Sequence, residues 1–348
     1  MLTISELKRK SLEIRKPILY EGTPRLTVIT KSNNKKRLKV ILSGRGCSIP
    51  YCTMCPLPNY QSKLKDTIKY QLKKIFDYAT ESRPNEIVIY NDGSFFSDKE
   101  ITEDERAYLA QLFNESTATK LVLESLPQFL SADKLKKFKS YFNRNVVIQV
   151  SLGLQTQNDE YRSWLLASSF NLNTFEKSVK LLQNIGYSTR SHILTPLPLL
   201  NIDESTDELI KTAMFLGSLN VDKISFCLLR PQKNTLVGQW YKNGVVQNPT
   251  PNIIREARRI GRKLLSVGQI KEFGFDGIDG FTCGPEELPW DLCDSCGTKI
   301  RDFAKGILSG KVILCSNCNE ETKIKDQIIN SLPKKNTARS EYALLKYV

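Results

Sequence analysis

The stretch that decides the fold is RGCSIPYCTMCPLPN, residues 45–59, which holds three of the nine cysteines of the chain. Cys47, Cys52 and Cys55 directly follow an apolar run, and prolines end the stretch. Three is an odd number for disulfides and one short of a four-sulfur zinc site. Three thiolates on a [4Fe–4S] cluster leave one iron with an open coordination position. The alternatives are unliganded thiols or a zinc ion completed by a distant residue, of which His192 is the only histidine.

The composition is that of a soluble globular protein, with 348 residues, 40% hydrophobic and 25% charged. No apolar run reaches the length of about 20 residues that a membrane helix needs, and residues 1–16 lack an apolar signal core. We therefore expect a cytoplasmic protein with reduced thiols and no membrane partner. The net charge of +14 is explained either by solubility alone or by a polyanionic partner such as RNA. Four arginines at helical spacing, Arg255, Arg258, Arg259 and Arg262, favour the second reading.

Short apolar runs alternate with helical patterns over about 200 residues, which indicates parallel βαβ units. The predicted strands cover residues 38–43, 86–90, 120–124, 146–152, 189–194 and 223–229. Either a partial (βα)6 barrel or an open doubly wound sheet satisfies this pattern. Both put the functional loops at the carboxyl ends of the strands, so the cysteine loop lies on that rim. Cys227, inside the last of these runs, is interpreted as a small buried hydrophobe.

The cysteine loop resembles that of the radical S-adenosylmethionine (SAM) enzymes, whose common spacing is x3 then x2, whereas this loop has x4 then x2. The resemblance covers residues 38–270 and extends to the elongator-type branch, above all to its archaeosine-forming tRNA lyases. The segments that carry it, in order, are RGCSIPYCTMC, NDGSFFSDKEI, LVLESLPQFLS, VSLGLQTQNDEYR, HILTPLPLL and RPQKNTLVGQWYKNGVVQNPTPNIIREA. It implies an α/β partial (βα)6 TIM-type barrel.

The resemblance also implies roles for single residues. Cys47, Cys52 and Cys55 would ligate a [4Fe–4S] cluster whose fourth iron chelates SAM. Gly93 and Ser94 would contact the SAM amino group. Arg162 would pair with the SAM carboxylate, and Gln155 would also bind the cofactor. Glu124 and His192 are the candidate catalytic residues, although each also has a structural reading as a cap or a core residue.

Cys293, Cys296, Cys315 and Cys318 form two Cys-x2-Cys pairs at the spacing of a zinc ribbon. Zinc and an auxiliary iron–sulfur cluster both remain open for this site, and Cys283 lies nearby. The predicted organisation is an N-terminal extension (1–37), the barrel (38–270), a small Cys-rich metal-binding domain (271–325) and a tail (326–348).

The implied activity is reductive cleavage of SAM to a 5′-deoxyadenosyl radical, which abstracts a hydrogen from a macromolecule. The expected substrate is a modified tRNA base, split by an archaeosine-type C–N lyase. The alternatives are modification or excision in a ribosomally made peptide, and a non-enzymatic, metal-stabilised RNA-binding protein. Expected partners are tRNA or a peptide, an electron donor and a partner protein.

Overall fold

The computed structural model describes residues 3–16, 18–20, 26–32, 35–62, 67–91, 93–143, 145–246 and 248–276. The predicted metal site of Cys293, Cys296, Cys315 and Cys318, together with Cys283 and the tail, lies outside these residues.

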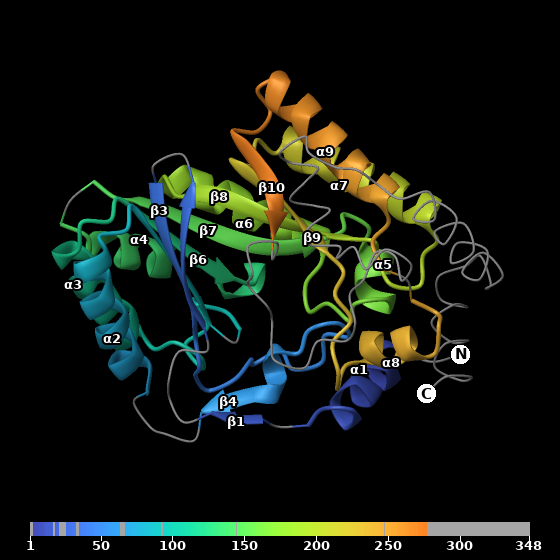
Figure 1. The fold of residues 1–348 in the computed structure, drawn as a ribbon, viewed down its shortest axis with the longest axis horizontal. Helices are drawn as coiled ribbons and strands as arrows, with labels where there is room; N and C mark the ends of the chain where they lie inside the picture. Colours follow the sequence, from blue (N-terminus) through green and yellow to red (C-terminus); the bar gives the residue numbers. More distant parts are fainter. Residues whose placement is uncertain are drawn as a thin grey trace.

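The main sheet has eight strands in the order β10-β9-β8-β7-β6-β5-β3-β2 (Figure 1). Their bounds are β2 Leu26–Ser32, β3 Lys35–Leu42, β5 Glu86–Asn91, β6 Lys120–Ser125, β7 Val147–Gln155, β8 Ser188–Thr195, β9 Lys223–Leu228 and β10 Glu272–Asp276. All neighbours pair in parallel except β2, which pairs with β3 in antiparallel register. A separate parallel pair joins β1 (Ile18–Tyr20) to β4 (Tyr60–Ser62).

The strand order decides between the two predicted architectures. The seven parallel strands follow one another in chain order, without the reversal that defines a doubly wound sheet. Each connection therefore advances by one strand, and the twisted sheet curls into a partial barrel (Figure 1). The six predicted strands and the partial TIM-type barrel are confirmed.

Helices cover the outside of the curled sheet, and further short elements lie at its open rim (Figure 1). The α-helices are α1 Ile4–Glu13, α2 Thr67–Ser82, α3 Glu103–Glu115, α4 Ala132–Ser140, α5 Asp159–Trp164, α6 Leu172–Ile185, α7 Ile202–Ser218, α8 Leu236–Lys242 and α9 Pro251–Ser266. Two 3₁₀ turns, η1 Leu57–Asn59 and η2 Pro127–Phe129, follow the loops after β3 and β6. No helix in the described part of the chain is long and apolar enough to cross a membrane.

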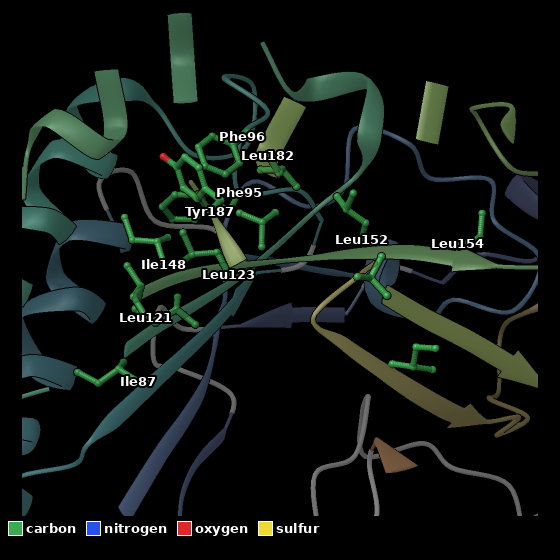
Figure 2. Packing of buried hydrophobic residues seen from close by; sticks show 14 of the residues in the cluster. Ile87, Phe95, Phe96, Leu121, Leu123, Ile148, Leu152, Leu154, Leu182 and Tyr187 are labelled. Atoms are coloured by element: carbon green, nitrogen blue, oxygen red, sulfur yellow. The ribbon is translucent and has the colours of Figure 1, made fainter. Parts of the chain in front are cut away.

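The main core lies between the outer face of the sheet and the helices. Alternate strand residues such as Ile87, Leu121, Leu123 and Ile148 are buried there (Figure 2). Phe138 of α4 stacks edge-on against Phe95 and Phe96, which follow β5. Because side chains alternate between faces along a strand, this outward apolar set directs the intervening residues into the barrel.

A second core fixes the rim. Leu7 of α1 packs with Leu165 and Leu166 after α5 and with Trp240 of α8, all of them buried. This cluster links the N-terminal helix to the loops that follow the later strands. The segment 1–37, predicted only as an extension, therefore contributes α1 to the rim and β2 to the sheet.

The sheet also continues past residue 270, where the sequence indicated the end of the barrel. β10 pairs with β9 over its whole length. Its pattern, EFGFD, is short, contains a glycine and has no Val, Ile or Leu, so it does not read as a buried apolar run.

Candidate functional site

Polar residues gather on the inner face of the barrel at the carboxyl ends of the strands. Tyr90, Glu124, Gln155, His192, Cys227 and Asp276 come from β5, β6, β7, β8, β9 and β10 and line a single cavity of about 220 Å³. Each stands at a position that alternates with outward apolar residues such as Ile89, Leu123, Leu154 and Ile193. The alternation that turns the apolar residues outward thus directs these polar side chains into the cavity.

A second cavity of about 130 Å³ adjoins the first. Its lining includes Cys47, Cys52, Cys55, Gly93, Ser94, Gln155 and Arg162. Cys55, Glu124 and Gln155 border both cavities. We call the cavity with all three loop cysteines the cysteine cavity and the larger one the inner cavity.

Distant segments hold the cysteine loop in place. The guanidinium of Arg15, just after α1, donates hydrogen bonds to the carbonyls of Cys52 (2.6 Å) and Cys55. Thr53 donates through its hydroxyl to the Leu165 carbonyl (2.6 Å) and through its N–H to the Leu166 carbonyl (3.2 Å). The Thr53 carbonyl accepts from the N–H of Val237 in α8 (3.1 Å). The loop backbone is therefore fixed on both flanks.

The buried carboxylate of Glu100 joins the cysteine loop to the loop after β5. One oxygen accepts from the N–H of Ser48 (2.9 Å) and from the Ser48 hydroxyl. The other accepts from the N–H of Ser94 and from the Asn91 amide (3.3 Å). A Cβ at Gly93 would lie 1.9 Å from this second oxygen, so the close approach requires glycine there.

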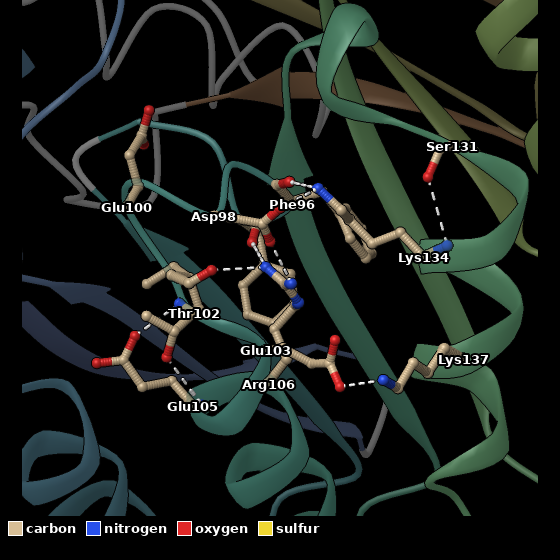
Figure 3. A network of polar contacts seen from close by, with 12 residues as sticks. Phe96, Asp98, Glu100, Thr102, Glu103, Glu105, Arg106, Ser131, Lys134 and Lys137 are labelled. Carbon is tan, nitrogen blue, oxygen red and sulfur yellow. Dashed lines mark hydrogen bonds and ion pairs between the residues drawn. The ribbon is translucent and has the colours of Figure 1, made fainter.

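Salt bridges on the outside hold the segment that carries Glu100 (Figure 3). Asp98 pairs with the buried Arg106 and with Lys134 (2.8 Å), and Arg106 also donates to the Ile101 carbonyl. Arg45, which precedes the cysteines, makes a bidentate ion pair with Glu105 (2.9 Å for each contact). A hollow of about 440 Å³ beside Arg106 and Lys134 is lined by these charges, which already pair with one another, so it forms part of the support.

The three loop cysteines suit a cluster better than a single ion. Among the described residues, His192, Cys227 and Asp276 form a group of potential metal ligands whose ligand atoms all lie within 4.8 Å of one another. The three loop cysteines do not form such a group. Zinc bound by sulfur at about 2.3 Å needs sulfurs about 3.8 Å apart. A wider set facing one cavity fits a group of several metal atoms. Cys47, Cys52 and Cys55 would hold the [4Fe–4S] cluster, and the rest of the cysteine cavity would hold SAM.

The electrostatics argue against a nucleophilic role for these thiols. Burial, followed by the carboxylate of Glu100, raises the pKa of Cys47 to about 12. Burial also raises the pKa of Cys52 and of Cys55. Cysteine nucleophiles have a lowered pKa, so these thiols do not have the environment of a nucleophile.

The structure brings the four residues expected to bind SAM to the cysteine cavity. Gly93 and Ser94 are fixed by Glu100, and the Ser94 hydroxyl accepts from the N–H of Leu126 (3.1 Å). Gln155 has a φ of 68°, in the left-handed region that is strained for a side-chain-bearing residue. Its Oε1 is buried without a hydrogen-bond partner among the described residues. Arg162 is buried, donates to the Thr156 carbonyl (2.6 Å) and pairs with Asp159.

The two candidate catalytic residues differ in position. Glu124 borders both cavities, and burial, followed by the charge of Asp276, raises its pKa to about 7. His192 borders only the inner cavity, where its Nδ1 lies 3.3 Å from the Cys227 Sγ. Burial and the guanidinium of Arg190 lower the pKa of His192 to about 3, so the imidazole is neutral at physiological pH.

Several residues of the site escaped the sequence analysis. Glu100 and Arg15 act through contacts between distant segments, which no local pattern announces. Asp276 stands on a strand that was not predicted. Cys227 is not a buried hydrophobe, because its sulfur borders the inner cavity beside His192. Period-2 alternation from Phe226 could have located it.

We expect Glu100→Gln to lower the free energy of unfolding by about 1–3 kcal/mol, because an amide cannot accept all the hydrogen bonds that converge on the carboxylate. The variant should also retain less iron after anaerobic reconstitution. Denaturant unfolding and iron analysis measure the two effects. Gly93→Ala should reproduce the iron loss, whereas Gly274→Ala, with no atom within 4 Å of its added Cβ, should not. Full iron retention in both Glu100→Gln and Gly93→Ala would contradict this linkage.

We expect Glu124→Gln to flatten the pH dependence of stability. The folded-state pKa of Glu124 is about 7, above its ordinary value of 4.5, so ionisation favours the unfolded chain and stability falls as pH rises between these values. Since one pKa unit corresponds to about 1.4 kcal/mol, the substitution should stabilise the protein at pH 8 relative to pH 4.5 by roughly 1–3 kcal/mol. Unfolding at both pH values tests this, with the exposed Glu160→Gln as control. Equal stability differences at the two pH values would refute it.

Comparisons with known proteins agree with this geometry. No family model matches the chain. An uncharacterized protein of Methanocaldococcus jannaschii is 24% identical over 246 residues, which are 66% of this chain and 67% of that protein.

Two solved structures share the fold. Elp3 of Methanocaldococcus infernus, with residues 1–46 deleted, superposes with a TM-score of 0.51 at 12% identity, over 70% of this chain and 58% of Elp3. The chain thus spans less than two thirds of the length of Elp3. A queuine lyase from Clostridium spiroforme, bound to SAM and queuine, gives a TM-score of 0.50 at 17% identity, over 73% of this chain and 97% of the lyase. The chain therefore shares the fold of these two proteins, a partial barrel of the radical SAM type, and carries three cysteines after the first parallel strand of that fold.

Proposed function

We propose that this chain is a radical SAM enzyme that acts on a modified nucleobase in tRNA, as a C–N lyase of the archaeosine type. The observation that carries the proposal is the pair of adjoining cavities, one bordered by Cys47, Cys52 and Cys55 and the other by polar groups on the barrel wall. Cys47, Cys52 and Cys55 would hold the cluster, which would supply the electron for reductive cleavage of SAM and so the means to abstract a hydrogen atom from the substrate. An electron donor must reduce the cluster.

The protein groups bind, orient and exclude water. Gly93 and Ser94 present their backbone to one end of the cysteine cavity, and Arg162 borders the same space. Glu124 and Gln155 stand where the two cavities meet, so they are placed to contact both SAM and substrate. The rigid strands behind them keep these side chains aligned with the substrate C–H bond.

The polar atoms of the inner cavity favour a ligand rich in N–H donors. Asn91 Oδ1, Gln155 Oε1 and Gln232 Oε1 are acceptors without a hydrogen-bond partner among the described residues. The carboxylate of Glu124 adds another acceptor on the same wall. A guanine-type base offers the matching N–H groups on its pairing edge. The structurally similar queuine lyase was solved with queuine, a modified base.

The outer surface supplies a route for polyanion binding. Arg255, Arg259 and Arg262 are exposed on α9, and Arg258 is partly buried. α9 connects the parallel strands β9 and β10 and so begins on the rim side of the barrel, which puts Arg255 nearest the rim. The cysteine-rich segment of Cys293, Cys296, Cys315 and Cys318 would add a zinc ribbon or an auxiliary cluster to the same enzyme.

The enzyme prediction concerns the loop cysteines. The anaerobically reconstituted protein, reduced in the presence of SAM, should release 5′-deoxyadenosine and contain about four irons for this site. The triple variant Cys47→Ala, Cys52→Ala, Cys55→Ala should lose both. Zinc and iron analysis of that variant also reports on the remaining cysteines, since iron with sulfide there would indicate an auxiliary cluster. Undiminished SAM cleavage in the triple variant would exclude the proposed activity.

The substrate prediction concerns salt. If tRNA binds along α9, its affinity should fall with salt at a log–log slope of roughly −0.7 for each phosphate contacted as a single strand. Arg255→Glu with Arg259→Glu should reduce the slope by about 1.4 and leave substrate-free SAM cleavage unchanged.

The matched control reverses two exposed lysines of α6, Lys177→Glu with Lys180→Glu, which changes the net charge equally. Fluorescence anisotropy with bulk host tRNA at two salt concentrations measures both pairs. Weak binding that responds equally to both pairs would reject the tRNA substrate and favour a peptide.

A further inference from the structure

Three potential metal ligands meet on the inner wall of the barrel, apart from the loop cysteines. His192, Cys227 and Asp276 come from the adjacent strands β8, β9 and β10, where Cys227 is in register with Leu194 on one side and with Asp276 on the other. Their ligand atoms all lie within 4.8 Å of one another. We propose that these three residues bind a divalent metal ion, zinc by the chemistry of the donor set, with one coordination position open to the inner cavity.

The distances match the edges of a zinc coordination tetrahedron. The Nδ1 of His192 lies 3.3 Å from the Cys227 Sγ and 3.5 Å from the Asp276 Oδ2. Zinc bonds of about 2.3 Å to sulfur and about 2.0–2.2 Å to nitrogen and oxygen give edges of about 3.6 Å and about 3.4 Å. Both His192 contacts therefore lie within a few tenths of an ångström of the tetrahedral edges, and the ligand atoms of Cys227 and Asp276 lie within 4.8 Å of each other. One nitrogen, one sulfur and one oxygen is a set that zinc accepts.

Hydrogen bonding explains the cluster less well. The neutral imidazole carries a proton on one nitrogen only, so Nδ1 either donates to Asp276 or accepts from the Cys227 thiol. In the first arrangement Nδ1 cannot accept a hydrogen bond from the Cys227 thiol, and in the second its lone pair faces the Asp276 carboxylate. A cation between the three groups makes both His192 contacts favourable.

The neighbouring charges support this arrangement. Arg190 holds the other oxygen of Asp276 at 3.1 Å, and its guanidinium also donates to Tyr90 (3.0 Å) and Ser225 (2.7 Å). This fixes Asp276 with Oδ2 turned toward His192, as groups behind metal ligands commonly do. A divalent ion is balanced by the Cys227 thiolate and the Asp276 carboxylate. Arg190 is then offset by Glu124, whose carboxylate borders the same cavity.

Three ligands and an open position form the pattern of catalytic zinc sites. All three residues border the inner cavity, and so does Gln232 with its buried, unpartnered Oε1. The open position would bind a nitrogen or oxygen atom of the ligand in that cavity and would orient it there. The site does not depend on the cluster or on SAM.

The test counts zinc in the full-length chain, with iron counted separately. Wild-type protein loaded with zinc and dialysed should hold one equivalent per chain more than His192→Ala and than Cys227→Ala. The cysteines outside the described residues are identical in all of these proteins, so their zinc cancels in the difference. Ser191→Ala, the adjacent position on β8 with its side chain on the other face, is the control and should retain all the zinc.

A second readout guards against a variant that fails to fold. Cobalt substitution in the background lacking Cys47, Cys52 and Cys55 should give a thiolate-to-cobalt charge-transfer component that Cys227→Ala removes, while circular dichroism shows the same helix content. Equal zinc content in wild type and both variants, or a cobalt spectrum indifferent to Cys227, would overturn the site.

Discussion

The carboxylate of Glu100 is the constraint on which the functional rim depends. It is buried, and it accepts hydrogen bonds from two segments at once: from Ser48 beside the first cysteine, and from Asn91 at the end of β5 and Ser94 in the loop that follows. Because the two oxygens of one carboxylate accept hydrogen bonds from both segments, the distance between these segments is fixed. Because Gly93 has no Cβ to collide with the Glu100 carboxylate, the loop after β5 comes close enough to border the cysteine cavity. The ligands of the predicted cluster and the predicted contacts to SAM thus share one anchor.

The barrel supplies the rest through strand periodicity. Each parallel strand buries alternate apolar residues against helices, so the residues between them must face inward. Strand order without reversal brings the carboxyl ends of seven strands around one opening, where inward polar residues from β5 to β10 meet. The packing of the outward apolar residues against the helices therefore determines that Glu124, Gln155 and His192 point into the barrel.

The sequence analysis identified features that depend on neighbouring residues and missed those that depend on contacts between distant segments. Short apolar runs alternating with helical patterns predicted six strands, and the spacing of Cys47, Cys52 and Cys55 predicted the loop that the structure places on the rim. Glu100 and Arg15 could not be found in this way, since the contacts by which they hold the cysteine loop span 37 to 52 residues of sequence. β10 was missed because a five-residue strand with a central glycine carries little pattern. With β10, the sequence analysis also missed Asp276.

The charges inside the barrel indicate what kind of ligand it accepts. Arg190 forms an ion pair with Asp276 and donates hydrogen bonds to Tyr90 and Ser225 on the barrel wall. Glu124 makes no ion pair among the described residues, and burial together with the negative charge of Asp276 raises its pKa against the opposing effect of the Arg190 guanidinium. A buried carboxylate in this position is stabilised by a ligand that brings N–H donors or positive charge. Since Glu124 stands between the two cavities, a ligand in either one can satisfy it, and the occupancy of one cavity therefore changes the electrostatic cost of filling the other.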